Sequence, residues 1–173
     1  MPSIWPHLLN ASADALFPPR CRACGVLFPP PRRHDTEGLM SAGDSMTALF
    51  MQVFSGLLCP DCRQGLNPVR SPICRCCGMV MAGAPGDDPL CADCLDGPSG
   101  FSQARAACVC EGVLLEILHR FKYGGCTELA RPLAALLSAA FRRHFPGACI
   151  DAVVPVPLHP RRLRSRGFNQ AEL

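Results

Sequence analysis

Aromatic residues are scarce in this sequence of 173 residues, which holds one tryptophan and one tyrosine. Surfaces that bind single-stranded nucleic acid by stacking need exposed rings beside basic side chains, so the composition supports such a surface only thinly. The longest apolar run, Met46–Leu58, contains Gln52 and is shorter than the roughly 20 residues that a membrane-spanning helix needs. No basic segment followed by an apolar one opens the chain, so we expect a cytoplasmic protein without a secretory signal.

Excess charge of one sign is also missing. The formal net charge is +3 when the cysteines are counted as neutral. If eight cysteines bind two zinc ions as thiolates, eight negative and four positive charges are added, which takes the net charge to about −1. The sequence pI of 8.3 is therefore no evidence for a nucleic-acid partner.

Cysteine, in contrast, is abundant, with 13 residues in the chain. Eight of them form four C-x-x-C pairs: Cys21/Cys24, Cys59/Cys62, Cys74/Cys77 and Cys91/Cys94. In a chain without a secretory signal, such pairs indicate metal binding rather than disulfides. Two residues between the cysteines allow a tight turn to direct both sulfurs at one ion, and two such turns complete a tetrahedral structural zinc site.

The spacing predicts how the pairs combine. The third and fourth pairs are separated by the thirteen residues 78–90, close to the separation in a zinc ribbon. The first and second are separated by 34 residues, 25–58. We therefore expect two structural zinc ions, one at each consecutive set. An interleaved pairing, Cys76 as a substitute ligand, and redox-active dithiols are the alternatives; four pairs so close together favour zinc.

The long first spacing indicates an insertion at about 29–54. It begins with the Pro-rich, charged stretch PPPRRHDTEG, in which we interpret His34 as a solvent-facing residue rather than a ligand. Apolar residues then recur at helical spacing from Met46 to Leu57, which predicts a helix. A short helix within residues 3–17 is also expected. Asp87 and Asp88 are interpreted as a turn of the second ribbon, not a ribose-binding pair, because no strand precedes them and no Thr-Thr-Gly follows.

Beyond residue 100 the periodicity changes. The expected order is a strand at Ala104–Cys110, a helix carrying Leu114 and Phe121 and ended by Gly124, a second helix, and a strand at Ile150–Val156. The second helix is marked by apolar residues from Leu129 to Phe141, with Pro132 in its first turn and Arg142, Arg143 and His144 in its C-terminal turn. This alternation predicts a βαβ-type crossover and a parallel sheet.

Residues 151–173 read DAVVPVPLHPRRLRSRGFNQAEL. Pro155 and Pro157 end the apolar run, because proline cannot donate to a sheet ladder. Four arginines follow within six residues: Arg161, Arg162, Arg164 and Arg166. Ligands of open α/β sheets bind beyond the carboxyl ends of strands, and arginine suits bidentate contacts with phosphate. The stretch predicts an anion-binding loop, the alternative being an exposed basic turn.

The segments PVPLHPRRLRSRGFNQAEL and HRFKYGG resemble the ComF family of competence-associated proteins, which are similar to type I phosphoribosyltransferases. The resemblance implies a loop that holds the pyrophosphate of phosphoribosyl pyrophosphate (PRPP), with Mg²⁺ accompanying PRPP in a full-length form. The implied contacts are Pro155, Val156, Pro157, Leu158, His159, Arg161, Arg162 and Arg164. Arg166, beside Gly167 and Phe168, is a candidate structural anchor instead. Single-stranded DNA and competence proteins are further implied partners.

The family pattern continues with a strand bearing two acidic residues and a Thr-Thr-Gly loop, and this sequence has neither. We therefore expect a C-terminally truncated chain, inactive alone, with no catalytic residues assigned and only weak binding of PRPP or pyrophosphate. The predicted organisation is a tandem zinc-ribbon module at 1–99 followed by a partial α/β, phosphoribosyltransferase-like parallel-sheet domain at 100–173. The alternative function is a zinc-ribbon module that binds nucleic acid or protein without transferase activity.

Overall fold

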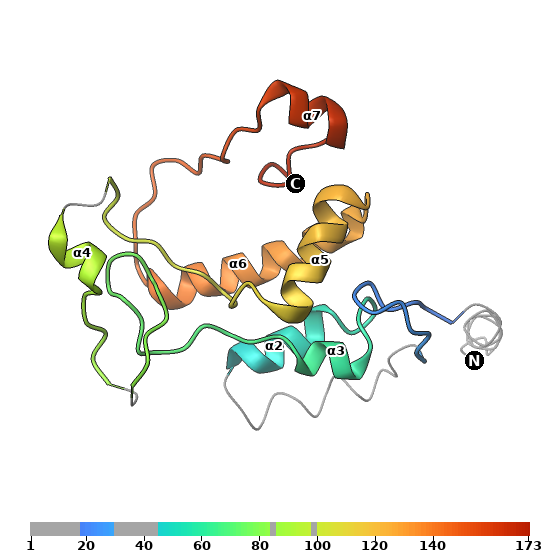
Figure 1. Cartoon of the computed structure of the whole chain (residues 1–173), viewed down its shortest axis with the longest axis horizontal. Helices are drawn as coiled ribbons and strands as arrows, with labels where there is room; N and C mark the ends of the chain where they lie inside the picture. Colours follow the sequence, from blue (N-terminus) through green and yellow to red (C-terminus); the bar gives the residue numbers. More distant parts are fainter. Residues whose placement is uncertain (1–17, 30–44, 84–85, 98–99) are drawn as a thin grey trace, which may run out of the picture.

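The computed structural model describes residues 18–29, 45–83, 86–97 and 100–173. Their helices are α2 (Ser45–Val53), α3 (Pro60–Gln64), α4 (Ala92–Asp96), α5 (Gly112–Tyr123), the 3-10 turn η3 (Thr127–Leu129), α6 (Ala130–His144) and α7 (Pro160–Arg166) (Figure 1). In these ranges β-pairing is limited to the isolated bridges Arg20–Leu27, Pro68–Cys108 and Ile73–Val80. Within them, no helix is both long and apolar enough to cross a membrane.

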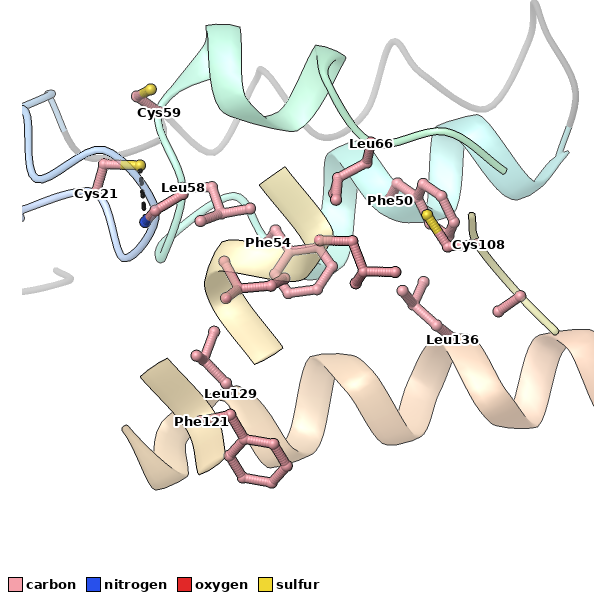
Figure 2. Close-up of a cluster of buried hydrophobic side chains, with 14 of the residues drawn as sticks. Cys21, Phe50, Phe54, Leu58, Cys59, Leu66, Cys108, Phe121, Leu129 and Leu136 are labelled. Atoms are coloured by element: carbon pink, nitrogen blue, oxygen red, sulfur yellow. Dashed lines mark hydrogen bonds between the residues drawn. The ribbon is translucent and has the colours of Figure 1, made fainter. Parts of the chain in front are cut away.

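The hydrophobic core lies where α2, α5 and α6 meet. Phe50, Phe54, Ile117 and Leu129 are almost completely buried there. Figure 2 shows Phe50 and Leu66 on one side of this cluster and Leu136 of α6 on the other. Residues on both sides of position 100 therefore share one continuous core.

Helix α5 forms where the apolar spacing predicts it. Leu114, Ile117 and Phe121 recur at intervals of three and four residues and are the buried side chains of the helix. Burying each contributes roughly 1.5–3 kcal/mol of hydrophobic free energy. Gly124 ends the helix, and a Cβ at this position would lie 2.8 Å from the carbonyl oxygen of Arg120. Only glycine allows the chain to leave α5 in this way.

Helix α6 also follows the prediction. Pro132 is its third residue, in the first turn, where proline removes no intrahelical hydrogen bond. Leu136 and Ala140 continue the buried face from Pro132. The last turn carries Arg142, Arg143 and His144, and cations stabilise this end of a helix dipole.

The insertion supplies part of the core rather than only a surface loop. Its predicted helix is present as α2, which packs against α6. Met46 and Phe50 of α2 and the following Phe54 are buried. The Pro-rich part with His34, and the helix expected within residues 3–17, lie outside the described residues.

The two strands predicted for a parallel sheet do not form in the part of the chain that the structure describes. Residues 104–110 make one bridge, flanked by hydrogen bonds from the Val69 N–H to the Ala107 oxygen (3.2 Å) and from the Val109 N–H to the Asn67 oxygen (2.9 Å). Residues 152–159 are extended without pairing, and Val153 is 89% exposed. A strand needs a neighbour for its backbone N–H and C=O groups, and no described segment provides one here.

The arginine-rich stretch differs from the predicted loop as well. Arg161, Arg162, Arg164 and Arg166 lie on helix α7, and residues 170–172 form a turn. From the end of α6 the chain runs as an extended arm to α7, which lies on the same side of the molecule as α5 (Figure 1). Proline at the first position of α7 and Gly167 after its last residue set its two ends.

Candidate metal centres and the basic helix

Eight cysteines gather into two tetrads. Cys21, Cys24, Cys59 and Cys62 form the first, and Cys74, Cys77, Cys91 and Cys94 form the second, with all sulfurs of a tetrad within 4.8 Å of one another. The Cys24–Cys59 and Cys77–Cys91 sulfur separations are 3.8 and 3.6 Å. Four thiolates at about 2.3 Å from one zinc ion are about 3.8 Å apart. Both tetrads therefore fit a structural zinc ion, and the prediction of two zinc ions is confirmed with consecutive rather than interleaved pairing.

The first cysteine pair of each ribbon lies in a tight knuckle. The Cys21 N–H donates to the Val26 oxygen, and the Cys74 N–H donates in the same way to the Met79 oxygen, both at 2.8 Å. Gly25 and Gly78 follow the second cysteines with φ of 78° and 74°, a left-handed conformation that glycine adopts without strain. The C-x-x-C-G sequence thus forms the same turn twice.

The second cysteine pair of each ribbon begins a short helix. Cys59 and Cys91 are the residues immediately before α3 and α4, and Cys62 and Cys94 lie in their first turns. One turn of helix brings residues three apart to the same face, so both sulfurs point to the same ion. Each ribbon is therefore one knuckle plus one helix start.

The pKa values of the cysteine thiols differ within each tetrad. Burial raises the pKa of Cys21, but the N–H groups of Cys24, Cys59 and Ala23 outweigh it and lower the value to about 6. The pKa of Cys74 is likewise about 6, mainly because the Cys91 N–H donates to its sulfur at 3.4 Å. Burial and the neighbouring sulfurs raise the pKa of Cys62 and Cys94 well above the usual value. A divalent cation is what would stabilise four thiolates at such short separations.

Arg105 and Asp88 brace the second ribbon. Arg105 donates from Nη2 to the Arg75 oxygen (3.0 Å) and from Nη1 to the Cys76 oxygen (3.4 Å), which are carbonyls of the knuckle. Asp88 Oδ1 accepts from the Ile73 N–H at 3.0 Å, and this hydrogen bond lowers the pKa of Asp88. Sequence reasoning missed Arg105, which lies within a predicted strand, and no local signal there marks it.

Helix α7 presents three of its arginines to solvent. The Nδ1 atom of His159 accepts from the Arg161 N–H at 3.2 Å and caps the helix. Arg161, Arg162 and Arg164 are exposed. At 100° per residue, Arg161 and Arg164 share the face opposite Leu163 and Arg166. Pro155, Val156 and Pro157 are exposed and Leu158 is half-buried in the extended arm just before the helix.

Arg166 is directed elsewhere. Its Nη2 donates to the Tyr123 hydroxyl oxygen and its Nη1 to Gln170 Oε1, both at 2.8 Å. The structure therefore separates Arg166, half-buried against α5, from the three arginines of the predicted anion site.

Comparison with known proteins supports the zinc ribbons directly. Residues 51–95 match the double zinc ribbon domain family. The match spans both cysteine pairs of the second tetrad and Cys59 and Cys62 of the first.

Two curated proteins are similar over most of this chain. The competence protein ComFC of Bacillus subtilis is 29% identical over 132 residues, which are 73% of this chain and 53% of that protein. The DNA utilization protein YhgH of Salmonella typhi is 31% identical over 130 residues, 67% of this chain and 57% of that protein. The chain thus spans a little over half the length of these relatives. No solved structure matches. Together with the double zinc ribbon, these similarities support the identification of a ComF family protein.

Proposed function

We propose that this chain takes part in DNA uptake or use, and that its segment 155–164 binds the pyrophosphate group of PRPP. The first part is supported by the names of its relatives, a competence protein and a DNA utilization protein. The second is supported by the ComF resemblance to phosphoribosyltransferases and by the exposed arginines of α7. Residues 100–173 would then belong to a phosphoribosyltransferase-like domain, and residues 1–99 to the zinc-ribbon module.

The observation that carries the pyrophosphate site is the cluster of Arg161, Arg162 and Arg164 at the end of a proline-stiffened arm. Guanidinium groups bind phosphate oxygens through charge-assisted, often bidentate, hydrogen bonds. In a phosphoribosyl transfer, charge develops on pyrophosphate as its bond to the ribose C1 breaks, and positioned cations stabilise that charge. These three arginines would supply that stabilisation, and Mg²⁺ bound with PRPP would supply further positive charge.

Binding by this segment alone is expected to be weak. The sequence has no acidic strand with a Thr-Thr-Gly loop, which the family resemblance implies for the ribose and the 5′-phosphate. Three exposed arginines without those contacts correspond to a dissociation constant of about 1 mM, or about −4 kcal/mol. The affinity should fall as salt is added, because exposed charges are screened.

A pyrophosphate titration followed by backbone amide shifts tests the site. We expect perturbed amides at 155–164, and a weaker affinity in Arg161→Met and Arg164→Met. The matched control is Arg142→Met, an exposed arginine in the last turn of α6, which should bind as the unmodified chain does. If the shifts gather on the zinc ribbons while 155–164 stays unperturbed, the pyrophosphate assignment is wrong.

The second candidate function is a zinc-ribbon module that binds another protein or nucleic acid without transferase activity. Met79, Val80 and Leu95 of the second ribbon are 46%, 49% and 68% exposed, which favours a protein partner. A nucleic-acid surface has less support, because Arg63 donates to the Met51 oxygen within the fold. Titration with a single-stranded oligonucleotide separates a protein-binding from a nucleic-acid-binding ribbon. The amide shifts of a ribbon that binds only protein should not change when the oligonucleotide is added.

A further inference from the structure

The sequence RGFNQ at 166–170 closes the basic segment into a loop. Asn169 is only 6% exposed, and its Nδ2 donates to the Val156 carbonyl oxygen at 3.1 Å. The same amide group donates to Glu172 Oε1 at 2.8 Å, and Asn169 Oδ1 accepts from the Ala171 N–H at 3.2 Å. One buried side chain thus joins the extended arm before α7 to the turn after it.

Two other side chains of RGFNQ dock this loop on α5. The Arg166 guanidinium lies 4.6 Å from the centre of the Tyr123 ring and donates to the Tyr123 hydroxyl oxygen at 2.8 Å. The centre of the Phe168 ring lies 5.7 Å from the centre of the Phe121 ring, and Phe121 belongs to the core. Gly167 makes the required reversal, with φ of 81° and its N–H donating to the Leu163 oxygen at 2.8 Å.

Helix α7 has little else to hold it. It is seven residues long and buries no side chain. A single helix of this length is unstable in water, because forming the first turn costs more conformational entropy than its hydrogen bonds return. Its direction relative to α5 is therefore set by the contacts at its ends.

We propose that Tyr123, Arg166, Phe168 and Asn169 form a clasp that positions the anion-binding arginines. The proposal rests on the proposed function, because the pyrophosphate site is the one that the clasp would orient. Arg166 and Tyr123 act as positioning residues that do not touch pyrophosphate. The clasp also gives Tyr123, at the end of the HRFKYGG segment, a role that the sequence alone does not assign.

Tyr123→Leu and Asn169→Ala test the clasp, with Arg164→Met as the matched variant that removes an arginine and leaves the clasp intact. Two zinc ions per chain and an unchanged helical circular dichroism spectrum show that each variant is folded. Two quantities are then measured: amide exchange over 161–167, and pyrophosphate affinity. We expect both clasp variants to exchange at least about tenfold faster and to bind about tenfold more weakly, a change of about 1.4 kcal/mol.

The clasp variants and Arg164→Met should differ in amide exchange. Arg164→Met should weaken pyrophosphate binding with unchanged exchange. If Arg166 is a direct ligand instead, Tyr123→Leu releases its guanidinium, and affinity stays the same or rises, which would overturn the proposal. Unchanged exchange in both clasp variants would overturn it too. If the unmodified chain binds no pyrophosphate, the proposed site fails, while the exchange measurement still decides whether the clasp holds α7.

Discussion

Cys21 and Cys59 of the first zinc ribbon pack in the same apolar cluster as α5 and α6, whereas Cys74 and Cys91 of the second are buried outside that cluster. The second ribbon is attached through polar contacts instead, from Arg105 to its knuckle carbonyls and from Ala104 N–H to the Cys76 oxygen at 2.8 Å. Two sites with the same ligands and the same turns are thus connected to the rest of the chain in different ways.

This difference predicts that zinc stabilises a different part of the fold at each site. Zinc binding to a site that does not persist in the unfolded chain contributes its free energy to folding. At the first site that free energy supports the whole core, since Leu58 and Cys59 contribute to it. At the second site it supports a local unit, of the kind that opens separately in many proteins.

The largest expected effect separates Cys59→Ser from Cys91→Ser. Both cysteines are nearly buried, at 4% and 5% exposure, and each variant should lose one zinc ion. Cys59→Ser should also abolish amide protection at Ile117 and Leu129, because the residues of the first ribbon would no longer pack in the core. Cys91→Ser should keep that protection. Zinc analysis and amide exchange measure both, and equal loss of protection would show that the two ribbons fold as one unit.

A smaller effect is expected from alanine at the two knuckle glycines. A Cβ at Gly78 would lie 2.6 Å from the Ala104 carbonyl oxygen, whereas nothing lies within 4 Å of one at Gly25. Both have positive φ, so Gly25→Ala should cost about 1 kcal/mol of conformational strain. Gly78→Ala should cost about 2–3 kcal/mol because the steric clash is added to that strain. Zinc competition with a chelator measures the affinity of each site; equal losses would mean that Ala104 does not brace the knuckle.

The smallest expected effect compares one arginine that contacts each ribbon with the other. Arg105→Met removes hydrogen bonds to three knuckle carbonyls and should destabilise the second ribbon by about 1–3 kcal/mol. Arg22→Met removes a largely exposed ion pair with Glu128, whose Nε–Oε1 distance is 3.0 Å; such pairs contribute about 0–1 kcal/mol. Denaturant unfolding with amide probes in each ribbon measures both. A larger loss from Arg22→Met would show that the first ribbon depends on charge rather than on apolar burial.

Local patterns in the sequence were sufficient for the zinc ligands and for three helices. A C-x-x-C pair indicates two ligands of one ion by its spacing alone, and the spacing of apolar residues in α2, α5 and α6 indicates which face of each helix is buried. Both signals lie within a few consecutive residues. The strand predicted at Ile150–Val156 shows where this reasoning stops. Its β-branched residues favour an extended backbone, and the arm is extended, but pairing requires a neighbouring segment that no local pattern can supply.

The sequence by itself determined which residues can bind zinc, which stretches form the core helices, and that a basic stretch follows a proline-rich arm. Only the tertiary structure decided that the cysteine pairs combine consecutively, that Arg105 braces the second knuckle, and that Arg166 turns to Tyr123 while Arg161 and Arg164 face solvent. The four arginines within six residues carry the same side chain, and the sequence singles out Arg166 as a candidate anchor only by its neighbours Gly167 and Phe168. Their roles differ because an aromatic side chain from α5, 43 positions from Arg166, lies beside one of them and not beside the others.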